Sequence, residues 1–224
     1  MGQAAGTGVA DSSVAAFIQA AADGLRRAIA WPTKAAVYVG AASLVLMMAL
    51  TVADVTLRNL AAVVVPGGME MTGLLMILVA LSTLAAAELE GSHIRVDLIL
   101  QALPGFARKP TIAGGLVLTL ATIVVAGAQI LLQGLHLWHN GIVTGVLGVP
   151  EWPFVAAATC FMLLFATALL ASFAAALAGV AQMRDPRALA ILLAWVAVTG
   201  LILVAALFPQ YLPFDMPRGM RGIM

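Results

Sequence analysis

The sequence predicts an all-α protein, a polytopic transmembrane helical bundle of about five spanning helices preceded by an N-terminal interfacial amphipathic helix. Hydrophobic residues make up 63% of the 224 residues and charged residues only 9%, with a mean hydropathy of +1.08. Soluble domains carry about 25% charged residues, so this chain cannot cover itself with a hydrated surface. Because the net charge is only +1, nucleic acid is not an expected partner, whereas membrane lipid is.

The first expected element is an amphipathic helix over residues 11–30. Its polar residues, including Arg26 and Arg27, fall on the side opposite to the apolar residues, and Trp31-Pro32 is expected to end it. We predict a cytoplasmic segment over 1–33 with its arginines at headgroup level. A frayed, partly disordered tail is the alternative interpretation. The apolar positions at helical spacing are Val14, Phe17, Ile18, Ala21, Leu25 and Ile29.

Five apolar runs are then long enough to cross a membrane, because a 30 Å hydrocarbon core needs about 20 residues at 1.5 Å each. We expect these spans to be uninterrupted helices. The first four form a domain over 34–180, and the fifth lies in a C-terminal segment over 181–224. The spans cover residues 34–57, 70–87, 111–137, 152–180 and 188–208.

The distribution of basic residues predicts the orientation. If the N-terminus is cytoplasmic, eight of the eleven Lys and Arg residues lie inside, and three, Arg58, Arg218 and Arg221, lie outside. The loop over 138–151 has neither Lys nor Arg, as an outside loop should. The sequence therefore favours a cytoplasmic N-terminus and an outside C-terminus.

Charged residues near the outer end of the first two spans are candidate interface residues. Asp54 and Arg58 are four residues apart, so they share a helix face and can pair. They are either an ordinary neutralising pair or a docking point for a neighbouring subunit. Glu70 opens the second span, where the helix dipole favours a carboxylate, and a bridge to Arg58 would close the hairpin.

The third span carries a polar stripe of Gln129, Gln133 and His136 on one face of its outer half. Hydrogen bonds between helices of this chain would explain the stripe, and a face toward a partner subunit is the alternative. We expect no catalytic residue, cofactor or metal site: the chain has no phosphate-binding loop, His93, His136 and His139 do not form a ligand set, and Cys160 stands alone.

The loop after the second span carries the most specific motif. Residues 93–100 read His-Ile-Arg-Val-Asp-Leu-Ile-Leu, which resembles a segment of the small permease subunits of tripartite ATP-independent periplasmic (TRAP) transporters, the DctQ family. The Asp-Val-x-x-Arg at 54–58 and the acid at Glu70 are similar to further family features. His93, Arg95 and Asp97 therefore join the candidate interface or structural residues.

The resemblance implies a non-enzymatic subunit of the bacterial inner membrane. It would bind and stabilise a large TRAP permease subunit (DctM-like) for sodium-driven symport of an organic acid, such as a dicarboxylate or sialic acid. A periplasmic substrate-binding protein (DctP-like) would deliver that acid. The family generally has four spans, so the fifth is either a helix like those that link fused permeases or an addition at the complex edge.

Three other functions would each require features that this sequence largely lacks. A membrane anchor subunit of a respiratory or redox complex would need histidines within its spans. An intramembrane enzyme would need clustered acids or a nucleophile with its base. An autonomous small carrier would place its substrate at broken helices related by internal repeats, and no convincing repeat is visible.

Overall fold

The computed structural model of the chain describes residues 6–90, 103–181 and 186–207. These residues form six helices and no strand, apart from an isolated bridge between Val143 and Pro150. The helices are α1 (Gly6–Ala61), α2 (Gly68–Ser82), α3 (Leu84–Leu89), α5 (Gly105–Asn140), α6 (Trp152–Ala181) and α7 (Pro186–Leu207).

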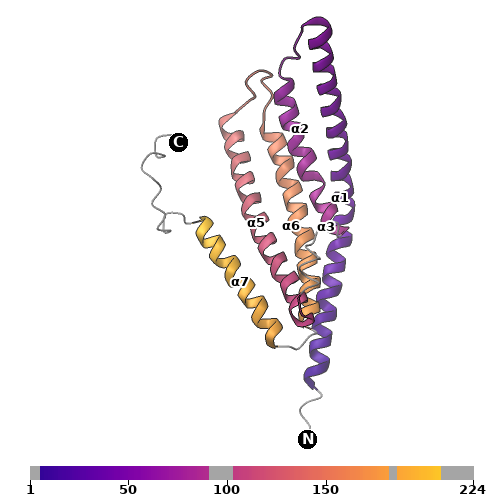
Figure 1. The fold of residues 1–224 in the computed structure, drawn as a ribbon, viewed down its shortest axis with the longest axis vertical. Helices are drawn as coiled ribbons and strands as arrows, with labels where there is room; N and C mark the ends of the chain where they lie inside the picture. The colour runs from indigo at the N-terminus through magenta and orange to yellow at the C-terminus, as the bar shows by residue number, and fades with distance from the viewer. Residues whose placement is uncertain (1–5, 91–102, 182–185, 208–224) are drawn as a thin grey trace, which may run out of the picture.

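The helices lie side by side in a flat array (Figure 1). Helix α6 is central, because it packs against α1, α2, α3 and α5, whereas α7 packs chiefly against α5. The chain crosses the array five times, so the described N-terminal end and the starts of α5 and α7 share one end. The α1–α2 and α5–α6 loops share the other end, which we call the loop end.

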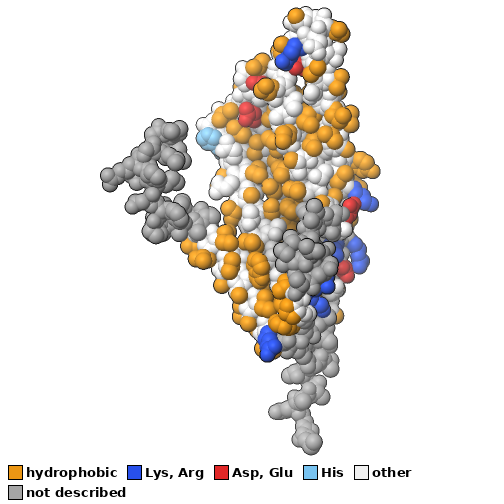
Figure 2. All heavy atoms as spheres, viewed as in Figure 1, with side chains coloured by type: hydrophobic (Ala, Val, Ile, Leu, Met, Phe, Trp, Pro, Cys, Tyr) orange, Lys and Arg blue, Asp and Glu red, His pale blue; other side chains and the backbone are white. Residues whose placement is uncertain are grey.

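Five helical segments are long and apolar enough to cross a membrane, as the sequence predicts. The fifth predicted span is confirmed as α7, which begins at Pro186. Helix α5 is longer at both ends than predicted, since it runs from Gly105 to Asn140. Figure 2 shows a broad hydrophobic band across one face, with charged side chains toward the upper tip and along the lower right edge.

The predicted end of the amphipathic helix at Trp31-Pro32 is wrong. Helix α1 continues through Pro32 as one helix of 56 residues, about 84 Å long at 1.5 Å per residue. Proline removes one hydrogen-bond donor from a helix, but packing against neighbouring helices can maintain the helix across it. The buried neighbour Thr33 and the buried Ala36 one turn later provide such packing here.

A seam of mostly small residues explains how α1 packs along so much of its length. Its buried positions recur at intervals of three, four or seven residues, which places them on one helix face. At Gly40 an added Cβ would collide with the Ser82 side chain, so only glycine fits this approach of α1 to α2. The buried members of the seam are Ala22, Ile29, Thr33, Ala36, Gly40 and Ser43.

The expectation of uninterrupted spans is wrong for the second span, which divides into α2 and α3 at Thr83. Thr83 keeps helical dihedral angles (φ −89°, ψ −16°), and its carbonyl oxygen accepts the Ala87 N–H at 3.0 Å. The hydroxyl of the buried Ser82 donates to the Val79 carbonyl at 3.3 Å, a backbone contact that accompanies helix bends. The interruption is therefore a local distortion rather than an unwound segment.

Two apolar clusters hold the array together. Ala85 of α3 packs with Phe165 and Leu169 of α6. Nearer the start of α7, Ala113 of α5 packs with Ala188 and other residues of α6 and α7. Gly114 lies so close to Trp195 that an added Cβ would overlap the indole, which explains how α7 approaches α5 closely.

Candidate functional site

Asp54 and Arg58 form the ion pair that their spacing predicts, with 2.7 Å between Asp54 Oδ2 and an Arg58 Nη. The other carboxylate oxygen of Asp54 accepts the Val65 backbone N–H at 3.0 Å. Val65 lies in the α1–α2 loop, so Asp54 joins the end of α1 to that loop. The pair is on the rim of the bundle, because the Arg58 side chain is 59% exposed and the Asp54 side chain 22%.

The predicted bridge between Glu70 and Arg58 is wrong. Glu70 instead accepts the backbone N–H groups of Val146 at 2.9 Å and Leu147 at 3.2 Å, one on each carboxylate oxygen. These donors belong to the α5–α6 loop, more than 70 residues away in the chain. The carboxylate therefore joins the start of α2 to the α5–α6 loop through two hydrogen bonds.

The α5–α6 loop has an ordered conformation that presents these donors. Thr144 is buried at its centre; its N–H donates to the Val149 carbonyl at 2.9 Å, and its hydroxyl accepts the Val149 N–H at 3.1 Å. Gly148 adopts a positive φ of 63° next to this contact. Thr144 and the two N–H donors were not among the residues chosen from the sequence, because backbone donors leave no side-chain pattern to find.

The structure brings three predicted residues around one opening at the loop end. A pocket of about 590 Å³ is lined by Asp54, Arg58 and Glu70 together with residues of the α1–α2 loop and Val146. His93, Arg95 and Asp97 lie outside the described residues.

Gln129 and Gln133 lie on α5, facing outward at membrane depth, and both are exposed. In the described part of the chain neither amide has a hydrogen-bond partner. They border an open groove of about 710 Å³, which we call the α2–α5 groove. Its other walls are apolar residues of α2 and α6: Gly73, Met76, Ile77, Ala80, Leu81, Val155 and Ala158, with Ile130 of α5.

His136, the third member of the predicted stripe, lies apart from this groove. Its ring nitrogen is 3.1 Å from the Asn140 side-chain amide nitrogen one turn later, and both residues are exposed. Nearby, Trp138 packs on Trp152 with ring centroids 4.7 Å apart. Tryptophan is enriched where a membrane meets water, so these rings indicate the interface at the loop end.

Comparison with known families decides the identity. Residues 47–179, more than half of the chain, match the family of tripartite ATP-independent periplasmic transporters, DctQ component. The chain belongs to this DctQ family. It is thus a TRAP transporter small permease subunit, a multi-pass membrane protein and a transporter component rather than a member of an enzyme family. Members of the family work with DctM and DctP partners.

No curated protein and no solved structure gives a significant match to this chain. The DctQ match includes every candidate residue named above, from Asp54 to His136. It excludes the first 46 residues, and hence most of α1, and also α7.

Proposed function

We propose that this DctQ subunit binds and stabilises a large DctM-like permease subunit in the bacterial inner membrane. The complex takes up an organic acid with sodium, and a DctP-like periplasmic protein delivers the acid. In this proposal residues 34–180 form the small-permease domain, residues 1–33 the cytoplasmic segment, and residues 181–224 the additional helix and tail.

The α2–α5 groove is the main structural support for this proposal. An amide facing lipid lacks the hydrogen bonds that water would supply, so polar residues in spans are usually placed against another helix. Gln129 and Gln133 have no such helix in the described part of this chain, yet they border an apolar groove. A helix of the large subunit lying in this groove would cover its apolar walls and supply partners for both amides.

The shape of the bundle supports an accessory role. In each of the five spans, 39% or less of the apolar stretch is buried within the array, and in α5 the buried share is 0%. A carrier that enclosed its own substrate would need a more enclosed interior around broken helices. Here the α2–α3 interruption keeps helical geometry, and the wide apolar faces favour assembly with a larger partner.

The proposed orientation places the N-terminus in the cytoplasm and the C-terminus in the periplasm. Five of the basic residues in the described part of the chain lie in the half away from the loop end, Lys34 lies near the middle of α1, and Arg58 belongs to the loop end. This asymmetry is the one expected for a cytoplasmic face. The five are Arg26, Arg27, Arg108, Lys109 and Arg187.

Copurification of the large subunit from mild detergent tests the groove. A hydrogen bond between transmembrane helices contributes about 0.6 kcal/mol on average. Losing two such bonds in a Gln129→Leu/Gln133→Leu variant should lower the affinity for the large subunit about eightfold, since 1.4 kcal/mol corresponds to a factor of ten.

A matched control is present on the same helix. Thr119 and Thr122 are also exposed, but their hydroxyls donate to the Gly115 and Leu118 carbonyls of their own helix, both at 2.9 Å. A Thr119→Val/Thr122→Val variant should therefore bind the large subunit as the unmodified chain does. Equal binding by both double variants would show that the groove is not the docking surface. Failure of the unmodified chain to bind any large permease would contradict the proposed function itself.

A further inference from the structure

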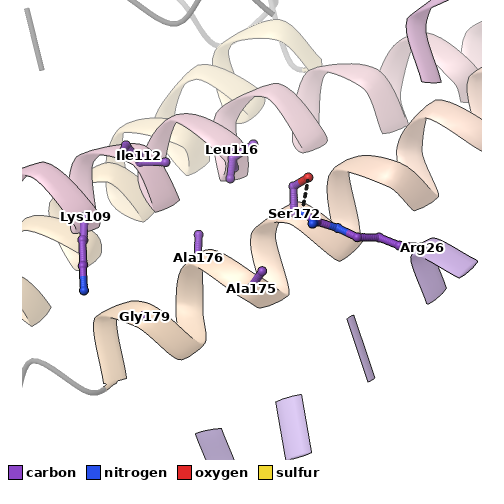
Figure 3. Close-up of a pocket in the computed structure, with 8 residues that line it drawn as sticks. All are labelled: Arg26, Lys109, Ile112, Leu116, Ser172, Ala175, Ala176 and Gly179. Carbon is purple, nitrogen blue, oxygen red and sulfur yellow. Dashed lines mark hydrogen bonds between the residues drawn. The ribbon is translucent and has the colours of Figure 1, made fainter. Parts of the chain in front are cut away.

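A second groove lies between α1, α5 and α6, away from the loop end and the α2–α5 groove. It has a volume of about 280 Å³, and its floor includes the small residues Ala175, Ala176 and Gly179 of α6. Figure 3 shows Arg26 of α1 beside Ser172 at one end of this strip and Lys109 of α5 toward the other. We call it the Arg26–Lys109 groove.

Arg26 occupies an unusual position in the packing of α1. It falls between Ala22, 2% exposed, and Ile29, 8% exposed, at intervals of four and three residues along the buried seam. This seam position, where small or apolar residues otherwise lie, directs the guanidinium against α6. The sequence pattern instead predicts Arg26 on the polar side of an amphipathic helix, at headgroup level.

The guanidinium is under-satisfied in the described part of the chain. One of its Nη atoms donates to the Ser172 hydroxyl at 3.4 Å, a long contact. Its Nε is buried and has no hydrogen-bond partner among the described residues. Neither Arg26 nor Lys109 forms an ion pair with a described acidic residue. Two cations therefore border one groove without a described anion between them.

The depth of the groove identifies its surroundings. Ser172 is 20 residues after Trp152 on α6, about 30 Å along the helix, which equals the thickness of a hydrocarbon core. With Trp152 at the interface of the loop end, Ser172 lies at the opposite interface. Phosphate groups of lipids are concentrated there, and basic pockets between transmembrane helices bind anionic headgroups on the cytoplasmic side.

We propose that the Arg26–Lys109 groove binds the phosphate group of an anionic phospholipid. Arg26 donates from its guanidinium to the phosphate oxygens, since an arginine fork matches phosphate geometry. Lys109 contributes a second positive charge, and its Cδ is 4.0 Å from the position that a Cβ on Gly179 would occupy. The small residues of α6 leave room for the headgroup, while the acyl chains extend along the apolar faces of the helices.

Lipid binding by the purified full-length chain tests this proposal. The protein, stripped of lipid in detergent, is mixed with phosphatidylglycerol, with phosphatidylethanolamine or with inorganic phosphate, and native mass spectrometry measures what it retains. Phosphatidylglycerol should be retained preferentially. Arg26→Gln and Lys109→Gln should each weaken its retention about fivefold, the contribution of one basic residue near an anionic surface.

Arg27→Gln is the matched control, because Arg27 is the exposed neighbour of Arg26 on the same helix and its replacement removes the same charge. It should retain phosphatidylglycerol as the unmodified chain does. Because Lys109 is exposed, Lys109→Gln provides the test even where loss of Arg26 disturbs folding. Arg26→Lys keeps the charge but loses the planar fork, so its retention of phosphatidylglycerol should fall between that of the unmodified chain and that of Arg26→Gln.

Four results would overturn the proposal. Equal retention of both lipids, or equal loss in the Arg27→Gln variant, would show that binding is not specific to the groove. Retention of inorganic phosphate that phosphatidylglycerol does not displace would assign the groove to a free anion. Exclusion of phosphatidylglycerol when the large subunit is bound would assign it to an acidic side chain of that subunit.

Discussion

Replacing Gly67 tests how the two loops at the loop end fit together. Gly67 has a φ of 70°, and a Cβ at this position would overlap the side chain of Leu147. A non-glycine residue with left-handed dihedral angles costs about 1–2 kcal/mol. Leu147 is 39% exposed, so it can move aside, and we assign this displacement the low end of the overpacking range, about 1 kcal/mol. The expected destabilisation by Gly67→Ala is therefore about 2–3 kcal/mol.

Two other glycines separate the contributions of strain and contact. Gly148 also has a positive φ, 63°, but a Cβ there would meet nothing within 4 Å, so Gly148→Ala should cost only the strain of about 1–2 kcal/mol. Gly73 is in a helix with equally open space, so Gly73→Ala should stabilise by about 0.5–1 kcal/mol. Adding Leu147→Ala to Gly67→Ala should remove the part of the destabilisation that comes from the overlap with Leu147, while the strain of the positive φ remains.

The assay is unfolding of the purified chain in mixed detergent micelles with increasing dodecyl sulfate, followed by circular dichroism. The order of stability should be Gly73→Ala, unmodified chain, Gly148→Ala and then Gly67→Ala. Equal destabilisation by Gly67→Ala and Gly148→Ala, with no recovery on adding Leu147→Ala, would refute the close contact between the two loops.

Other predictions address the ion pair, the fifth helix and the topology. For Asp54 and Arg58 a double-mutant cycle on unfolding should give a coupling free energy of about 0.2–1 kcal/mol, typical of exposed pairs. Asp54→Ala should be the more damaging single change because it also frees the Val65 N–H. Zero coupling would show that the two side chains do not interact. Gly114→Leu should detach α7 from α5, seen as faster proteolysis after Ala181, whereas Gly115→Leu, at an open position, should not. A periplasm-active reporter fused after Met224 should be active; a cytoplasmic signal would show that α7 does not span.

The order and number of spans could be predicted because the length and hydropathy of a run are local properties. The ends of the helices were harder to predict. Pro32 was expected to end a helix, since proline lacks an N–H donor, but the packing of Thr33 and Ala36 maintains α1 beyond it. Ser82, next to the division at Thr83, lies against Gly40 of another helix, and no pattern in the second span reveals that contact.

Side-chain partners across the chain were the least predictable. Asp54 and Arg58 are one helical turn apart, so their ion pair could be predicted from spacing alone. Glu70 was assigned to the nearest cation in sequence, yet it accepts backbone N–H groups of a loop more than 70 residues away. Arg26 and Ser172 are 146 residues apart, and their contact depends on which face of α1 meets α6.

Purification of this chain with an affinity tag from its native membrane, in mild detergent, tests the central claim most directly. We predict that one much larger membrane protein, the large TRAP permease, is recovered in a one-to-one ratio. Deletion of the gene for this chain should abolish uptake of one organic acid while the periplasmic protein still binds that acid. Recovery of a haem protein in place of the permease, or sodium-dependent transport of the acid by the reconstituted chain alone, would contradict the account.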